Sequence, residues 1–130
     1  MSRVNESALI VRTNLPALAD DDLDAAIELL HPDVEWRNTG LPTLRGKRVR
    51  AAISDMTRRK IDFAVEIHHI AADGGVVLTD RTDELAVGPV RTTFWVRGTF
   101  ELTDGLIRVW DDAFNWGGLA AGFFRRQRLG

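Results

Sequence analysis

The first part of the chain carries hydrophobic residues at the three- and four-residue spacing of amphipathic helices. This spacing predicts helices over residues 3–13, 22–31 and 47–59. Pro16 is expected to kink or end the first helix, and Pro32 to end the second. The inward-facing positions are Val4, Ala8, Val11, Leu23, Ile27, Leu30, Val49, Ile53 and Met56.

From residue 61 onward the chain is rich in β-branched and aromatic residues, and glycine-containing turns interrupt it. The predicted strands cover residues 61–72, 76–86, 91–102 and 106–115. The turns between them are Asp73–Gly74–Gly75, Gly88–Pro89 and Asp104–Gly105, the last being the strongest hairpin signal. A shorter strand, 33–38, and a loop, 39–46, precede the third helix, and a short helix is expected around 119–127.

The order of these elements predicts an α+β fold. Three helices followed by a long antiparallel meander require the sheet to curl around the helices, because one of its faces must be buried. The length of 130 residues fits one domain, 1–130.

Composition removes several kinds of chemistry. The chain has no cysteine and no tyrosine, which excludes disulfides, thiolate nucleophiles and a phenol acid. Lys plus Arg is 17 and Asp plus Glu is 19, a net charge of −2, so no strong basic field is expected for nucleic acid. We find no metal-ligand spacing and no phosphate or dinucleotide loop, so we expect no metal and no cofactor.

The N-terminal segment does not resemble a targeting signal. It lacks a long apolar stretch and contains Glu6 and Arg12, and no window approaches the roughly 18 apolar residues of a membrane span. We expect a cytoplasmic protein without a membrane partner.

Charged residues on two predicted strands are the candidates for chemistry. Alternation places Arg81 and Asp83 on one face of their strand. On the last strand it places Asp112 between Trp110 and Phe114, with Leu106 and Arg108 on the same face and Ile107 and Val109 on the other. This framing indicates an apolar cavity around Asp112, since a buried polar group is costly unless it is paired. Periodicity leaves open the alternative that these charges form ion pairs on the wet face of the sheet, where they contribute little.

Three segments resemble the limonene-1,2-epoxide hydrolase family. They are VEWRNTGLPTLRGKRVRAAI (34–53), VVLTDRTDEL (76–85) and GTFELTDGLIRVWDDAF (98–114). The resemblance implies the cone-shaped fold of the nuclear transport factor 2 superfamily. It also implies that Arg81 bridges Asp83 and Asp112, that Asp112 is the general base on a water, and that Asp83 is the general acid. Asn38 would hold the water, which attacks an epoxide directly without a covalent intermediate.

Residues around these positions complete the expected site. The family keeps a water-binding tyrosine two residues before the asparagine, and here that position is Trp36, whose indole N–H donates but cannot accept. Apolar walls for a small epoxide substrate are expected from Trp95, Trp110, Phe114 and Leu85, together with Trp36. The resemblance further implies a homodimer through the outer face of the sheet, with Leu29 and Val96 as candidate contributors.

The two adjacent histidines do not form a predicted metal site, and an alternative to the hydrolase function stays open. His68 and His69 are adjacent, so regular alternation would turn them to opposite faces and prevent joint metal binding. A SnoaL-like cyclase or isomerase, or a small-molecule binding domain of the same fold, is the alternative to a hydrolase. Such cyclases typically rely on a single acid or base, whereas Arg81, Asp83 and Asp112 form a charged set of three.

Overall fold

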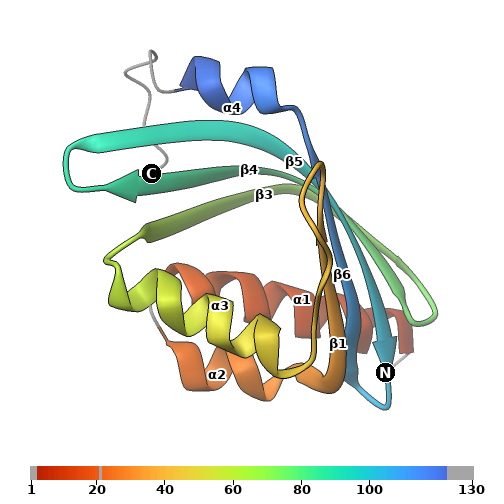
Figure 1. Ribbon diagram of the computed structural model, residues 1–130. Coiled ribbons are helices and arrows are strands. Elements are labelled where there is room, and N and C mark those ends of the chain that lie inside the picture. The colour runs from red at the N-terminus through yellow and green to blue at the C-terminus, as the bar shows by residue number, and fades with distance from the viewer. Residues whose placement is uncertain (1–2, 21, 123–130) are drawn as a thin grey trace.

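A curved six-stranded sheet and four helices make up the computed structural model, which describes residues 3–20 and 22–122 (Figure 1). The strands lie in the order β2-β1-β6-β5-β4-β3. They are β1 (Leu30–Asn38), β2 (Leu44–Arg45), β3 (Asp62–Asp73), β4 (Val76–Val87), β5 (Val90–Thr103) and β6 (Leu106–Phe114). The helices are α1 (Arg3–Ala19), α2 (Leu23–Glu28), α3 (Lys47–Arg58) and α4 (Trp116–Gly122).

The sheet is mixed. Strands β3 to β6 form the predicted antiparallel meander, whereas β1 pairs in parallel with β6 and places Asn38 opposite Asp112. The predicted Asp104–Gly105 turn joins β5 to β6, and both residues have the positive φ, 53° and 75°, that tight hairpins require. Only two helices precede the first strand; α3 follows β2, so the three helices are not one N-terminal block.

Two predicted helix ends were wrong. Helix α1 continues past Pro16 to Ala19, because Leu15 and Ala17 bury their side chains in the core and the Pro16 carbonyl accepts from Asp20 N at 2.9 Å. Helix α2 ends at Glu28, because Leu30 already pairs with β6 as the first residue of β1. Pro32 therefore lies within a strand. The predicted tail helix, 119–127, is described only as far as Gly122, and the remainder lies outside the described residues.

A bulge in the β5–β6 ladder corrects the alternation expected on the last strand. The register shifts between Glu101 and Leu102, so Ile107 and Trp110 are both buried in the core although they are an odd number of residues apart. Pairing carried on regularly from Thr103 and Leu106 would set Asp111 opposite Gly98, whereas the bulge sets Asp112 there. The bulge therefore decides which of two adjacent aspartates points inward.

A second bulge corrects the expectation for the two histidines. The register of β3 with β4 shifts between Ile67 and His69. His68 Nε2 lies 2.7 Å from Thr82 Oγ1 and His69 Nδ1 lies 3.1 Å from Asp80 Oδ2. Because Asp80 and Thr82 share the outer face of β4, both histidines face outward there and not to opposite sides.

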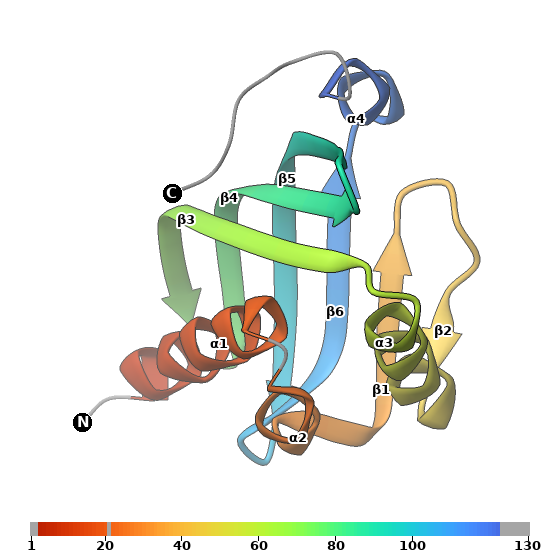
Figure 2. The ribbon, with the colours of Figure 1, turned by 90° about the vertical axis from the view of Figure 1, so that its left-hand side faces the viewer.

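The concave side of the sheet faces α1, α2 and α3 (Figure 2). The core between them includes Val11 and Leu15 of α1, Val49 and Ile53 of α3, and Phe100 of β5. In residues 3–20 and 22–122, no helix has the length and apolar character needed to cross a membrane.

Candidate active site

An apolar cavity of about 380 Å³ lies between the concave face of the sheet and the helices. Most of its lining is hydrophobic or aromatic, and among the residues that the structure describes the only charged ones in it are Asp83 and Asp112. Asn38 and Thr57 are its other polar residues. A cavity of this kind, apolar with a few convergent polar groups, is typical of a small-molecule site.

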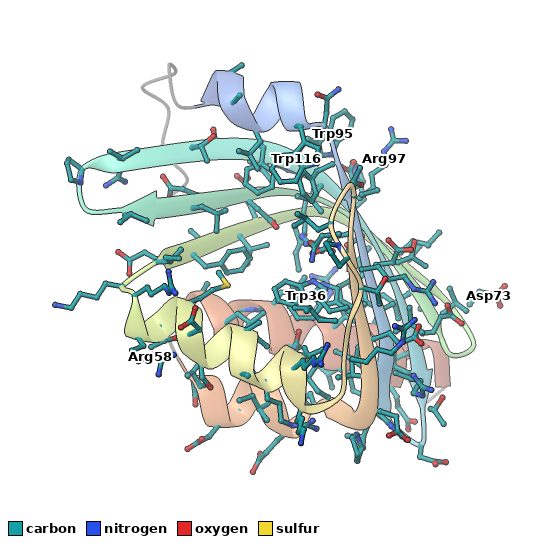
Figure 3. All side chains as sticks on the ribbon, viewed as in Figure 1. Trp36, Arg58, Asp73, Trp95, Arg97 and Trp116 are labelled. Carbon is teal, nitrogen blue, oxygen red and sulfur yellow. The ribbon has the colours of Figure 1, made fainter. Side chains whose placement is uncertain are left out.

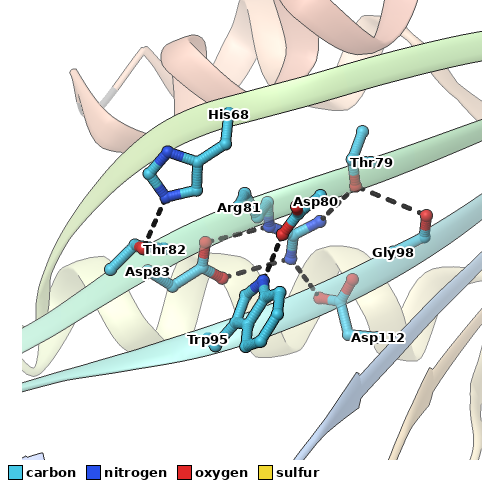
Figure 4. A network of polar contacts seen from close by, with 9 residues as sticks. All are labelled: His68, Thr79, Asp80, Arg81, Thr82, Asp83, Trp95, Gly98 and Asp112. Carbon is cyan, nitrogen blue, oxygen red and sulfur yellow. Dashed lines mark hydrogen bonds and ion pairs between the residues drawn. The ribbon is translucent and has the colours of Figure 1, made fainter.

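The guanidinium of Arg81 lies between the two carboxylates and binds both (Figure 4). Its Nε donates to Asp83 Oδ1 at 2.9 Å and its Nη2 to Asp83 Oδ2 at 3.1 Å. The same Nη2 lies 2.8 Å from Asp112 Oδ2. The side chain of Arg81 is 0% exposed, and those of Asp83 and Asp112 are 6% and 8% exposed. The predicted alternative of solvent-facing ion pairs is therefore wrong.

The third nitrogen of the guanidinium, Nη1, also has a hydrogen-bond partner. Arg81 Nη1 donates to Thr79 Oγ1 at 3.3 Å, and that hydroxyl donates in turn to the Gly98 carbonyl at 3.4 Å. A Cβ at position 98 would lie 2.5 Å from Arg81 Nη1 and 2.7 Å from Thr79 Oγ1. Glycine at 98 thus leaves free the space that the Arg81 guanidinium and the Thr79 hydroxyl occupy.

Burial sets the protonation behaviour of the three groups. It raises the pKa of Asp112 to about 6, with Arg81 lowering it and the nearby Asp83 charge raising it further. Burial also raises the pKa of Asp83, against the opposing effect of Arg81. Burial by itself would lower the pKa of Arg81, but the two carboxylates raise it above its ordinary value, so Arg81 stays charged. Two carboxylates this close favour one shared proton and titrate as a unit.

Three buried polar atoms around the cavity have no hydrogen-bond partner in the described residues. They are Asp112 Oδ1, Trp36 Nε1 and Trp110 Nε1. The two indoles stack at 4.5 Å with an interplanar angle of 16°, and Trp110 also stacks on Phe100 at 6.2 Å. Unsatisfied buried donors and acceptors are rare, and their gathering around one cavity indicates a place for a polar ligand atom or a water.

Most of the predicted wall residues line the cavity. Trp36, Leu85, Trp110 and Phe114 do so, and so does Asn38. Figure 3 shows Trp36 directed into the space between the sheet and the helices.

Trp95 is not a wall residue. It pairs with Thr82 on the outer face, is 56% exposed, donates from Nε1 to an Asp80 oxygen, and lies beneath Arg97 at 5.1 Å (Figure 3). Val96, proposed above as a contributor to a dimer interface on the outer face, is 1% exposed and lines the cavity instead. Residues directly opposite each other on paired strands share a face, and Arg81 pairs with Val96. Because Arg81 points inward, Val96 also points inward, and the adjacent Trp95 points outward.

Sequence reasoning missed a large part of the lining. The helices contribute apolar residues to the inner walls, and the β1–β2 loop and α4 contribute others. The additional residues are Leu18, Leu23, Leu41, Ile53, Met56, Ile61, Phe63, Phe94, Val96, Trp116 and Leu119. Pairing of Asp83 with Phe94 across β4 and β5 is the one signal that could have found some of them.

A family model described as the limonene-1,2-epoxide hydrolase catalytic domain matches residues 5–125. The chain belongs to this family. It is an enzyme of the epoxide hydrolase type, and a curated relative supports this: epoxide hydrolase EphG of Mycobacterium tuberculosis is 42% identical over 105 residues, 81% of this chain and 70% of that protein.

Solved structures agree with the family and extend the fold. The structure of an M. tuberculosis epoxide hydrolase of this type matches with a TM-score of 0.90 and 38% identity, covering 95% of this chain and 93% of that one. An NTF2-like protein of unknown function from Burkholderia pseudomallei matches with a TM-score of 0.79 and 19% identity, covering 96% of this chain and all of that one. The fold of this epoxide hydrolase is therefore NTF2-like.

The part of the chain that the structure describes, 3–20 and 22–122, holds no group of three or more histidine, aspartate or glutamate side chains arranged to hold a metal ion.

Proposed function

We propose that this enzyme adds water to a small apolar epoxide in one step and releases a vicinal diol. The observation that carries the proposal is the bridge from one buried arginine to two buried carboxylates on the wall of an apolar cavity. Asp112 is the general base and Asp83 the general acid. Arg81 holds both groups and stabilises the negative charge that they share.

The proposed step balances without a cofactor. As a water oxygen attacks one epoxide carbon, Asp112 accepts a proton from that water and the C–O bond breaks. Asp83 donates its proton to the departing epoxide oxygen, so both oxygens end as hydroxyls and the pair of aspartates keeps one proton. General acid and base catalysis contribute about 10²–10⁴-fold each, and holding the water in line adds more.

The water has a place beside Asp112. Asn38 is opposite Asp112 on the paired strand, and its side chain lines the same cavity. Asp112 Oδ1 is the carboxylate oxygen that Arg81 leaves free, and it can accept the proton. Trp36 Nε1 supplies a donor where the family keeps a tyrosine hydroxyl; a water held there accepts from the indole and donates to the carboxylate.

The walls support an uncharged hydrocarbon substrate. Among residues 3–20 and 22–122, no charged side chain other than the two aspartates lines the cavity, so these residues offer no partner to a charged group on the substrate. A homodimer through the outer face of the sheet, and a cytoplasmic location, remain proposals from the sequence.

The direct test is a single turnover in ¹⁸O-labelled water with the enzyme in excess over an apolar epoxide. We expect one labelled hydroxyl in the first diol formed, because the attacking oxygen comes from water. An unlabelled first-turnover diol would instead show that a carboxylate oxygen had attacked carbon. Binding of the epoxide without any diol would favour the binding-domain alternative.

The pH profile gives a second prediction. Because Asp112 must be ionised to act as the base and its pKa is raised to about 6, kcat/KM should fall about tenfold per pH unit below that value. A decline on the alkaline side should follow when the aspartate pair loses its remaining proton. Measuring kcat/KM between pH 4 and 10 checks this, and an acid limb near the ordinary pKa of an aspartate would contradict the assigned base.

A further inference from the structure

Trp116, the first residue of α4, contacts both the cavity and the loop after β1. Its Nε1 donates to the Thr39 carbonyl at 2.8 Å, its ring meets Phe114 edge-on at 5.1 Å, and the side chain lines the cavity. It is 46% exposed, which places it at the boundary between the cavity and solvent (Figure 3). The proposed chemistry gives it no part.

The acceptor of this bond is the residue that follows Asn38. Thr39 N donates to the Asp112 carbonyl at 3.2 Å, and Thr39 Oγ1 accepts from Phe114 N at 3.2 Å. The turn then closes through Leu41 N, which donates to the Asn38 carbonyl at 3.0 Å. Among these bonds, only the one from Trp116 comes from a side chain outside the ladder of β1 and β6.

The turn is shaped to receive the indole. Gly40 has φ of 76°, and a Cβ built there would lie 2.8 Å from Trp116 Nε1. A side chain at position 40 would thus be strained by its backbone and would push the indole from Thr39.

Helix α4 is held by its neighbours and not by its own helical propensity. Its described part, Trp116–Gly122, has seven residues, three of them glycine, and glycine disfavours the helical conformation. Thr92 Oγ1 donates to the Leu119 carbonyl at 2.6 Å, and Asn115 Oδ1 accepts from Gly118 N at 3.0 Å. A Cβ at Gly122 would overlap Thr92 Oγ1, so the helix end sits directly on β5. These contacts fix the position from which Trp116 reaches Thr39.

We propose that Trp116 is a positioning residue for Asn38. Its indole locks the turn Thr39–Leu41 against β6 and so fixes the Asn38 side chain at the site of the attacking water. This inference rests on the proposed function, because it gives Asn38 a water to hold. A displacement of about 1 Å in such a group can cost about 10²-fold in rate, so a single hydrogen bond to the adjacent peptide matters.

Trp116→Phe tests the proposal, because it removes the N–H donor and keeps an aromatic ring against Phe114. We expect kcat to fall about tenfold or more, while KM stays within about threefold of that of the parent enzyme because the apolar wall is retained. Hydrogen exchange at the amides of Thr39 and Leu41 should accelerate at least about tenfold. Trp95→Phe is the matched control: it removes an indole donor on the outer face and should change neither kcat nor exchange at these amides.

Gly40→Ala reaches the same contact from the other side. It should lower kcat and accelerate exchange like Trp116→Phe, and the double variant should be little worse than either single one, because both break one interaction. Unchanged exchange at Thr39 and Leu41 in Trp116→Phe would overturn the proposal, and so would faster exchange with kcat unaffected. The exchange readout needs no substrate, so an enzyme that forms no diol would fail the proposed function without deciding whether Trp116 locks the turn.

Discussion

Replacing Asp112 with asparagine should abolish diol formation while leaving the fold intact. Asparagine keeps the shape of the side chain but cannot take the proton of the attacking water, so the general-base contribution of about 10²–10⁴-fold is lost. Turnover of an apolar epoxide at pH 7.5, with product measured by gas chromatography, is the assay. Undiminished turnover would contradict the role of Asp112.

Stability separates this result from simple misfolding. Burial raises the pKa of Asp112, so the folded protein binds a proton there more tightly than the unfolded chain does. The contribution of this group to stability is therefore greatest below the ordinary aspartate pKa of about 3.9 and is lost as pH rises to about 6. At neutral pH the asparagine variant avoids the cost of a buried charge, and its Tm should be equal to or above that of the parent enzyme. Asp111→Asn, the adjacent substitution on the outer face, is the matched control and should retain turnover.

Arg81→Met should have the largest combined effect on activity and stability. The arginine is fully buried, and its removal leaves two carboxylates facing each other in an apolar wall with no counter-charge. Breaking a buried ion pair from one side costs about 3–5 kcal/mol. Both aspartates should then be protonated at neutral pH, so Asp112 can no longer act as the base. The variant should therefore lose activity as well as part of its free energy of unfolding. Urea unfolding at pH 7 and the diol assay measure the two losses.

A double-mutant cycle shows whether the three residues act together. If they form one unit, Arg81→Met combined with Asp112→Asn should lower kcat little more than the worse single variant. The double variant should also be more stable than Arg81→Met, because one of the two uncompensated carboxylates is gone. Additive losses of kcat would show that Arg81 and Asp112 act independently.

Local sequence patterns predicted most of the elements, and tertiary contacts explain the exceptions. Helix α3 and the four long strands follow the predicted ranges closely, because hydrophobic periodicity and turn residues act within a few positions. Pro16 failed to end α1 because packing of Leu15 and Ala17 outweighs the lost backbone bond. Trp95 was expected to face the cavity and Val96 the outer side of the sheet, but the structure has them the other way round. The reason is that pairing with β4 decides which residues of β5 face inward, and the composition of β5 alone does not.

The sequence by itself determined the chemistry that this protein can hold. The absence of cysteine and tyrosine left carboxylates as the candidates for chemistry, and the resemblance to the limonene-1,2-epoxide hydrolase family implied that Arg81, Asp83 and Asp112 form one site. Only the tertiary structure decided which groups meet. The parallel pairing of β1 with β6 brings Asn38 to Asp112 across more than seventy residues, and the β5–β6 bulge turns Asp112, not Asp111, toward Arg81. Such a bulge forms because both Ile107 and Trp110 gain from burial in the same core, which is a property of the assembled sheet and not of its last strand.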